Sequence, residues 1–164
     1  MWLLHITLLV SIGLANCECP GENVFEEIAG TCYYFSSDRD ETADWQGART
    51  ICQDMGSLLG MKVDLSELGA EASCMSDGLL MERIAEKGKL YTWLGGTDSS
   101  NEGTWHWASS GRSLSIMDSR WLLGDPNGDQ KENCLNAVVI GSYHRSYLND
   151  FTCGSVDYFV CQIL

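Results

Sequence analysis

The sequence predicts an α+β domain stapled by disulfides, and three observations support that class. The chain has 164 residues, the usual size of one domain. Its front part holds apolar residues at helical spacing, whereas the rest alternates short aromatic or β-branched runs with turn residues. It also carries eight cysteines, which fit an oxidising compartment. We therefore expect two helices flanking small antiparallel sheets.

The first 15 residues form a short apolar stretch that ends in the small residues Gly13 and Ala15. This spacing is typical of a signal-peptidase site, and the stretch is shorter than the roughly 20 apolar residues of a membrane anchor. We predict a cleaved signal peptide over 1–15, a mature domain over 16–164 and no transmembrane segment. The protein is expected to be secreted and extracellular.

Two helices are predicted in the front half of the mature chain. The first is expected to begin near Asp38, with Glu41 as a capping-box residue, and to end near Gly56. The second is expected over 76–87, with Gly88 as its C-cap. The apolar face of the first helix comprises Trp45, Ala48, Ile51, Cys52 and Met55.

Beyond these helices we expect strands over 90–94, 104–107, 137–140 and 158–161. The segment between Gly95 and Cys153 has little apolar periodicity, and it is rich in oxygen ligands that would repel one another without a cation. Calcium takes six to eight oxygen ligands, so the segment is predicted to be a long calcium-binding loop; a solvated acidic loop is the alternative. Its ligand-type residues are Asp98, Glu102, Asp125, Asn127, Asp129, Glu132, Asn149 and Asp150.

Several other functions are disfavoured by charge and motif. The net charge of −13 argues against nucleic-acid partners and against anionic membranes. An EF-hand starting at Asp125 fails, because Gln130 replaces its required glycine and Asn136 its bidentate glutamate. A structural zinc site is disfavoured since no Cys-x-x-Cys occurs.

The sequence also lacks the motifs that organise common active sites. No Gly-x-Ser-x-Gly elbow and no His-Glu-x-x-His zinc motif occurs. Nothing assembles His106 or His144 with a nucleophile, and His106 stands between Trp105 and Trp107 in a predicted strand. We predict that the protein is not an enzyme.

A series of short motifs runs along the mature chain in a definite order. It consists of Cys19-Pro20, Cys32-Tyr33-Tyr34-Phe35, Trp45 with Ala48 and Cys52, Trp93-Leu94-Gly95-Gly96, Asp98, Glu102-Gly103, Trp121, Asp125-Pro126-Asn127, Glu132-Asn133-Cys134, Leu148-Asn149-Asp150, Cys153 and Tyr158-Phe159-Val160-Cys161. This order resembles the C-type lectin-like domain in its long, secreted, single-domain form. Gly96 departs from the usual core tetrad, and Leu148 stands where tryptophan is usual.

The resemblance implies three disulfides, which join Cys19 to Cys32, Cys52 to Cys161 and Cys134 to Cys153. The family pattern does not specify Cys17 and Cys74. They could bond to each other, which we favour slightly, link two chains into a homo-oligomer, or leave a thiol free.

The resemblance also implies a principal calcium site, in which Pro126 would be cis. An auxiliary calcium site would be formed by Asp98, Glu102 and Asn133, although Gly128 and Asn133 stand where that site commonly has carboxylates. The principal ligands would be Asp125, Asn127, Glu132, Asn149 and Asp150, and the first four would also contact the sugar.

The function implied by the resemblance is calcium-dependent carbohydrate binding. A carboxylate before the proline and an amide after it resemble the mannose-type members, which favours mannose, fucose and N-acetylglucosamine over galactose; Asp125 is one methylene shorter than the usual glutamate. Glycans on microbial or cell surfaces, recognised in innate immunity, are the expected partners. The alternative is a lectin-like domain that binds a protein or another non-sugar ligand. Tyr143, His144 and Arg145 would touch a longer glycan or fill an enlarged loop.

Overall fold

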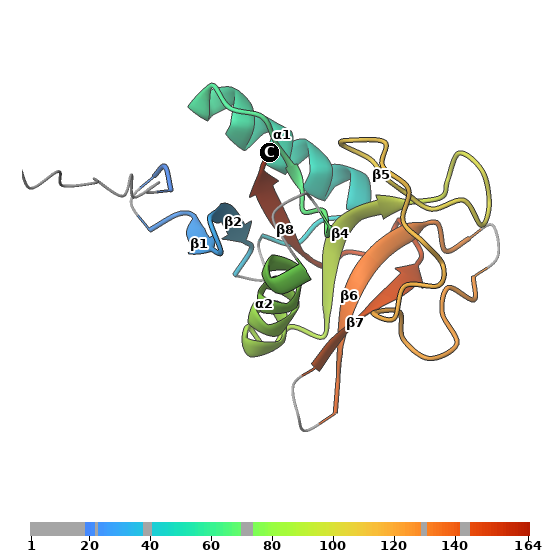
Figure 1. Ribbon diagram of the computed structural model, residues 1–164. Coiled ribbons are helices and arrows are strands. Elements are labelled where there is room, and N and C mark those ends of the chain that lie inside the picture. Colours follow the sequence, from blue (N-terminus) through green and yellow to red (C-terminus); the bar gives the residue numbers. More distant parts are fainter. Residues whose placement is uncertain (1–18, 22, 38–40, 70–73, 129–130, 142–144) are drawn as a thin grey trace, which may run out of the picture.

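The protein was analysed as a computed structural model, which describes residues 19–164 except 22, 38–40, 70–73, 129–130 and 142–144 (Figure 1). Two helices accompany a sheet, which confirms the α+β class. The helices are α1 (Trp45–Leu59) and α2 (Cys74–Glu86). The strands are β1 (Glu26–Ile28), β2 (Thr31–Phe35), β3 (Val63–Leu65), β4 (Tyr91–Thr97), β5 (His106–Trp107), β6 (Cys134–Ile140), β7 (Arg145–Phe151) and β8 (Tyr158–Ile163).

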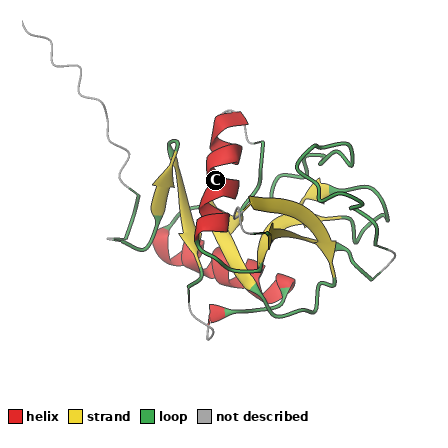
Figure 2. Ribbon diagram, turned by 90° about the horizontal axis from the view of Figure 1, so that it is seen from below, coloured by secondary structure: helices red, strands yellow, loops and turns green. Residues whose placement is uncertain are grey.

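The sheet is mixed: most of its strand pairs are antiparallel, as expected, and one pair is parallel. Its strands follow the order β1-β2-β8-β4-β6-β7, with β3 paired to β8 and β5 paired to β4. Figure 2 shows the strands together with the helices that accompany them. Strands β4 and β8 are parallel, with Trp93 opposite Phe159. A long excursion of the chain separates these two strands, so no hairpin forces them to be antiparallel.

Both faces of the central strands are buried, because neighbouring residues of a strand point to opposite sides. Trp93 of β4 and Phe159 of β8 pack against α1, whereas Leu94 and Val160 pack in the cluster that contains the apolar face of α2. All four are at most 1% exposed. The cluster on the α2 side also takes in Trp105, Trp107, Leu114 and Trp121 from the long loop.

Helix α1 begins and ends later than the sequence suggested. Asp44 is its N-cap, accepting a 2.7 Å hydrogen bond from the Gly47 amide, whereas Glu41 accepts from the Ser37 amide ahead of the helix. The predicted start, Asp38, lies outside the described residues. Gly56 does not end the helix: a Cβ there would lie 2.7 Å from the Met61 carbonyl oxygen, so this glycine permits close packing inside the element. The helix ends at Gly60, whose left-handed conformation glycine adopts without strain.

Helix α2 starts two residues before the predicted 76–87 segment and ends at Glu86, with Gly88 in the left-handed region just beyond. None of the helices in the described ranges is both long and apolar enough to cross a bilayer. Of the strands that follow α1, β3 and β7 were missed. Strand β3 has 3 residues with Asp64 at its centre, and β7 is largely polar and buries Asp150 as well as Leu148.

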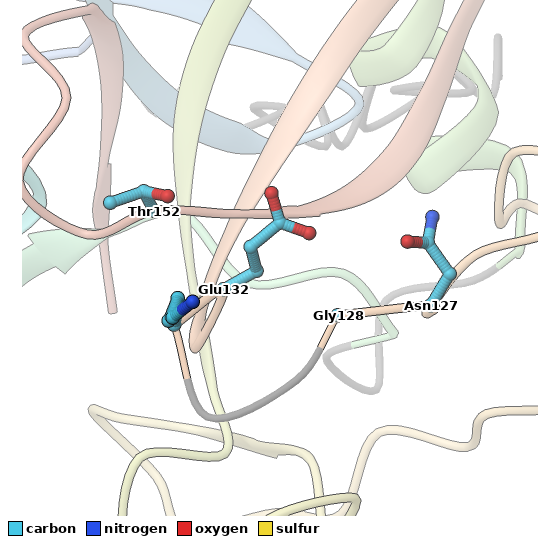
Figure 3. Close-up of a pocket in the computed structure, with 5 residues that line it drawn as sticks. Asn127, Gly128, Glu132 and Thr152 are labelled. Atoms are coloured by element: carbon cyan, nitrogen blue, oxygen red, sulfur yellow. The ribbon is translucent and has the colours of Figure 1, made fainter.

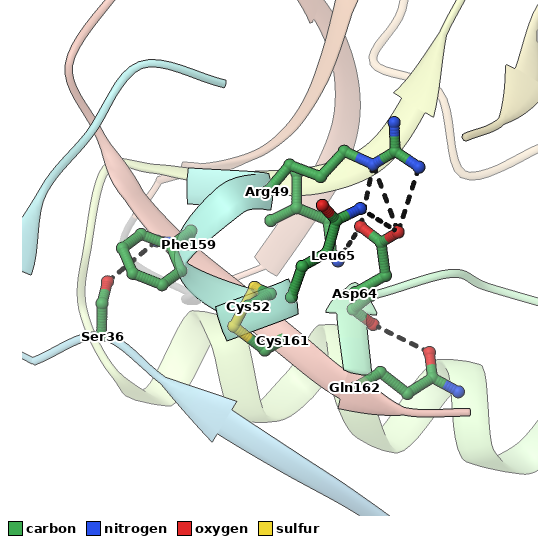
Figure 4. The surroundings of a disulfide bond; sticks show 10 residues. Ser36, Arg49, Cys52, Asp64, Leu65, Phe159, Cys161 and Gln162 are labelled. Carbon is green, nitrogen blue, oxygen red and sulfur yellow. Dashed lines mark hydrogen bonds and ion pairs between the residues drawn. A yellow bond between two sulfur atoms is a disulfide. The ribbon is translucent and has the colours of Figure 1, made fainter. Parts of the chain in front are cut away.

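The three disulfides implied by the resemblance are all present. Cys52 of α1 bonds to Cys161 of β8, and both cysteines are fully buried (Figure 4). Beside this bond Asp64 accepts hydrogen bonds from Arg49 at 3.0 Å and from Gln53 at 3.0 Å, which ties α1 to β3. Cys17 and the side chain of Cys74 lie outside what the structure describes, so their pairing stays a prediction.

Candidate metal centre

The predicted ligand residues come from two places that the fold brings together. One is the loop between β5 and β6, and the other is the end of β7, beside which the loop runs (Figure 1). Leu148 of β7 donates its amide to the Arg120 carbonyl at 2.8 Å and accepts from the Leu122 amide at 2.8 Å. These two backbone bonds fix the loop against the strand just before Asn149 and Asp150.

Asp125, Asn127 and Asp150 are in direct contact. The Asp150 carboxylate accepts from the Asn127 backbone amide at 2.9 Å and from the Gly128 amide at 2.5 Å. The Asn127 side-chain amide donates to Asp125, and the peptide bond between Asp125 and Pro126 is cis. Three of the predicted principal ligands therefore form one hydrogen-bonded unit.

Glu132 lies beside this hydrogen-bonded unit, in contact with Gly128. A Cβ built on Gly128 would lie 2.7 Å from Asp150 Oδ2 and 3.1 Å from Glu132 Oε2, so both carboxylates reach the same point. Figure 3 shows the Glu132 carboxylate and the Asn127 amide turned toward the space between them. A hollow of about 330 Å³ opens here, and it is lined by Asn127, Gly128, Lys131, Glu132 and Thr152.

The electrostatics of this unit suit a hard cation. Burial, and secondarily the charge of Asp150, raise the pKa of the Asp125 carboxyl. One oxygen of each carboxylate, Asp125 Oδ2 and Asp150 Oδ1, is buried and has no hydrogen-bond partner within the part of the chain that the structure describes. Buried anionic oxygens are normally paired or bound to metal, so these two atoms fit calcium as ligands. Within the described residues, carboxylates, histidines and cysteines form no metal-binding group of three or more. The amide oxygens of Asn127 and Asn149 could serve as ligands beside the carboxylates.

Asn149 makes its side-chain hydrogen bond to a residue outside the predicted ligand set. Its side-chain amide donates to Asn136 Oδ1 at 3.1 Å, across the β6–β7 ladder. Asn136 is fully buried, and the sequence reasoning did not single it out as a site residue. The available signal was an asparagine inside the otherwise largely apolar run from Cys134 to Ile140.

The auxiliary residues Asp98, Glu102 and Asn133 also meet. They line one hollow of about 240 Å³ together with Ser99, Ser100 and Asn101. Asp98 is 2% exposed; its Oδ2 accepts from the Gly103 amide at 2.8 Å, and its Oδ1 has no hydrogen-bond partner in the described ranges. The hollow thus offers one buried carboxylate oxygen to a cation.

Gly128 has no room for the carboxylate that the family pattern commonly places there. The Cβ position lies 2.6 Å from the Cβ of Glu132, closer than real side chains approach. The packing of Glu132 against Gly128 therefore excludes a carboxylate side chain at position 128.

Arg145 lies away from the predicted principal ligands. Arg145 opens β7 opposite Ile140, whereas Asp150 pairs with Leu135 near the other end of the ladder. Five residues along a strand span about 16 Å, which favours the enlarged-loop interpretation for Arg145. Tyr143 and His144 lie outside the described residues, as does Asp129. His106 lies in β5 opposite Thr97 of β4. Its neighbours along the chain, Trp105 and Trp107, are both buried, as expected of a structural residue.

Comparison with known proteins agrees with this architecture. The family model of the Lectin C-type domain matches residues 41–163. The C-type lectin domain family 4 member M of Nomascus concolor is 25% identical over 146 residues, covering 89% of this chain and 31% of that protein. The chain therefore spans about a third of the length of the curated relatives it matches.

Solved structures are similar over nearly the whole chain. Human lithostathine has a TM-score of 0.67 at 25% identity, covering 91% of this chain and 92% of its own. The mouse scavenger receptor C-type lectin carbohydrate-recognition domain has a TM-score of 0.64 at 24% identity, covering 88% and 94%, which supports the fold. The family binds ligands and is not enzymatic. From the matched domain, the shared fold and the three disulfides, we conclude that this chain belongs to the C-type lectin family.

Proposed function

We propose that the domain binds carbohydrate through calcium held by Asp125, Asn127, Glu132, Asn149 and Asp150. The observation that carries the proposal is the pair of buried, unpartnered oxygens, Asp125 Oδ2 and Asp150 Oδ1, on two carboxylates linked through Asn127. Carboxylates packed this closely are stabilised by a divalent cation, and calcium accepts such a mixed carboxylate and amide set.

The sugar would complete the coordination shell with two neighbouring hydroxyls. Each hydroxyl can also hydrogen-bond to a side chain that holds the ion: Asp125 and Glu132 can only accept, whereas Asn127 and Asn149 can also donate. This arrangement supports mannose-type sugars, namely mannose, fucose and N-acetylglucosamine. One shallow site typically binds a single sugar near millimolar, so recognition of microbial or cell surfaces in innate immunity would need several sites at once.

The auxiliary hollow at Asp98, Glu102 and Asn133 is proposed as a second calcium position, supported by the buried free oxygen of Asp98. We also propose that the protein acts outside the cell. Three disulfides favour an oxidising compartment, and the predicted signal peptide over 1–15 would deliver the chain there.

The test is a glycan array probed with the oxidised protein in calcium and in chelator. Wild-type protein should bind mannose-type glycans in calcium only, and Asn127→Ala should abolish this binding. Gln46→Ala, which changes an exposed amide on α1, is the matched control and should bind normally. Binding that persists in chelator, or in Asn127→Ala, would refute the proposal and favour a protein or another non-sugar ligand.

A further inference from the structure

Asn136 is a buried side-chain amide in strand β6, and its neighbours along that strand are apolar. It lies in β6 between Leu135 and Ala137, and all three are fully buried. Its Nδ2 has no hydrogen-bond partner in the described residues. An unpaired buried donor is costly, and such a group in a native protein calls for an explanation.

A reason for an amide at this position is found on the neighbouring strand β7. Asn136 stands directly opposite Asn149, and Asn149 Nδ2 donates to Asn136 Oδ1 at 3.1 Å. A side-chain amide has a donor end and an acceptor end that point in different directions. Because Asn136 engages the donor end of Asn149, the acceptor end, Oδ1, is the one that remains for a cation.

We propose that Asn136 is a positioning residue, which sets the amide of Asn149 so that its oxygen faces the metal. The proposal rests on the proposed function, since it takes Asn149 as a calcium ligand. Without the acceptor at 136, the Asn149 amide can turn over and present its NH₂ group, which repels a cation. Partners of this kind orient metal ligands, and their loss typically lowers metal affinity about 10- to 100-fold.

Two substitutions separate positioning from folding. Asn136→Leu has similar size and removes the acceptor, and Asn136→Asp keeps the acceptor while removing the donor that has no partner. In calorimetric calcium titrations, Asn136→Leu should bind calcium about 10- to 100-fold more weakly. Asn136→Asp keeps the acceptor and adds a negative charge, so it should bind calcium at least as tightly as wild type. The calcium-free melting temperature of Asn136→Leu should change little, because removing the buried donor that has no partner in the described residues offsets the one hydrogen bond lost to Asn149.

A readout without metal tests the hydrogen bond itself. In NMR spectra of the calcium-free protein, the Asn149 side-chain amide protons should exchange slowly in wild type and Asn136→Asp, and fast in Asn136→Leu. If Asn136→Leu does not fold, Asn136→Ala removes the same acceptor without added bulk.

Wild-type calcium affinity in the folded leucine or alanine variant would overturn the proposal, as would equal amide exchange in all variants. If the wild-type protein bound no calcium, the proposed function would fail. The exchange comparison would still decide whether Asn136 holds Asn149.

Discussion

Replacement of Asp150 by asparagine should remove the stabilisation of the folded protein by calcium. Asp150 is 3% exposed; one of its oxygens accepts two backbone amides, and the other has no hydrogen-bond partner among the described residues. Asp150→Asn can keep the first oxygen in place, but it sets an NH₂ group where the second oxygen would face the proposed ion. The variant should fold and lose calcium.

The size of the effect follows from linkage. At a calcium concentration 100 times its dissociation constant, the wild-type protein gains about 2.7 kcal/mol in free energy of unfolding. For a domain of this size that raises the melting temperature by about 5–10 °C. A roughly 100-fold weaker site would gain only about 0.4 kcal/mol, or about 1–2 °C.

Thermal unfolding followed by circular dichroism, with calcium and with chelator, measures this shift. Asp157→Asn is the matched control, since Asp157 is also a carboxylate with a buried oxygen that lacks a partner, but it bridges to Ala43 beside α1. The control should keep the whole calcium shift. A full shift in Asp150→Asn, or its loss in Asp157→Asn, would refute the reasoning.

Three further predictions concern other parts of the structure. Gly128→Ala should weaken calcium binding in titrations, because its Cβ would lie 2.7 Å from Asp150 Oδ2; unchanged affinity would contradict this contact. Replacing both Cys52 and Cys161 by alanine should cost about 4.7 kcal/mol in denaturant unfolding, against about 3 kcal/mol for Cys19 and Cys32, since the sequence separations are 109 and 13. The opposite order would show that strain or residual structure outweighs loop closure. Burial raises the pKa of the Asp157 carboxyl, so its charge opposes folding above that pKa and not below its unfolded value. Asp157→Asn should therefore be more stable than wild type at neutral pH without calcium, and the difference should vanish in acid; a constant difference would argue against titration as the cause.

The sequence predicted the structure best at residue types that serve a single structural purpose. The cysteines, the core tryptophans and the cis Asp125-Pro126 bond lie where the resemblance implied. It was less informative for β7, because the strand mixes buried Leu148 and Asp150 with half-buried Tyr147 and Asn149. Such a mixture shows no clean alternation and was assigned to a loop.

Two other differences have local causes. Asp38 and Glu41 have the spacing of a capping box, but Glu41 accepts from Ser37, and Asp44 caps α1 instead. Asn136 escaped notice because its role depends on strand register: only the pairing of β6 with β7 places it opposite Asn149. Spacing along the chain does not determine which residues face each other across a ladder.

The loop that carries Asp125 and Asn127 is anchored at buried Trp121 and at Cys134, and none of the described residues between them belongs to the core. The residues of this segment can therefore be exchanged without disturbing the packing of the core. The segment's composition can change without cavities opening in the interior, provided that Leu122 keeps its backbone bond to Leu148. Asn149 and Asp150 belong to the strand and would stay in place during such an exchange. Grafting segments of other composition between the two anchors would then retune ligand choice on a fixed frame.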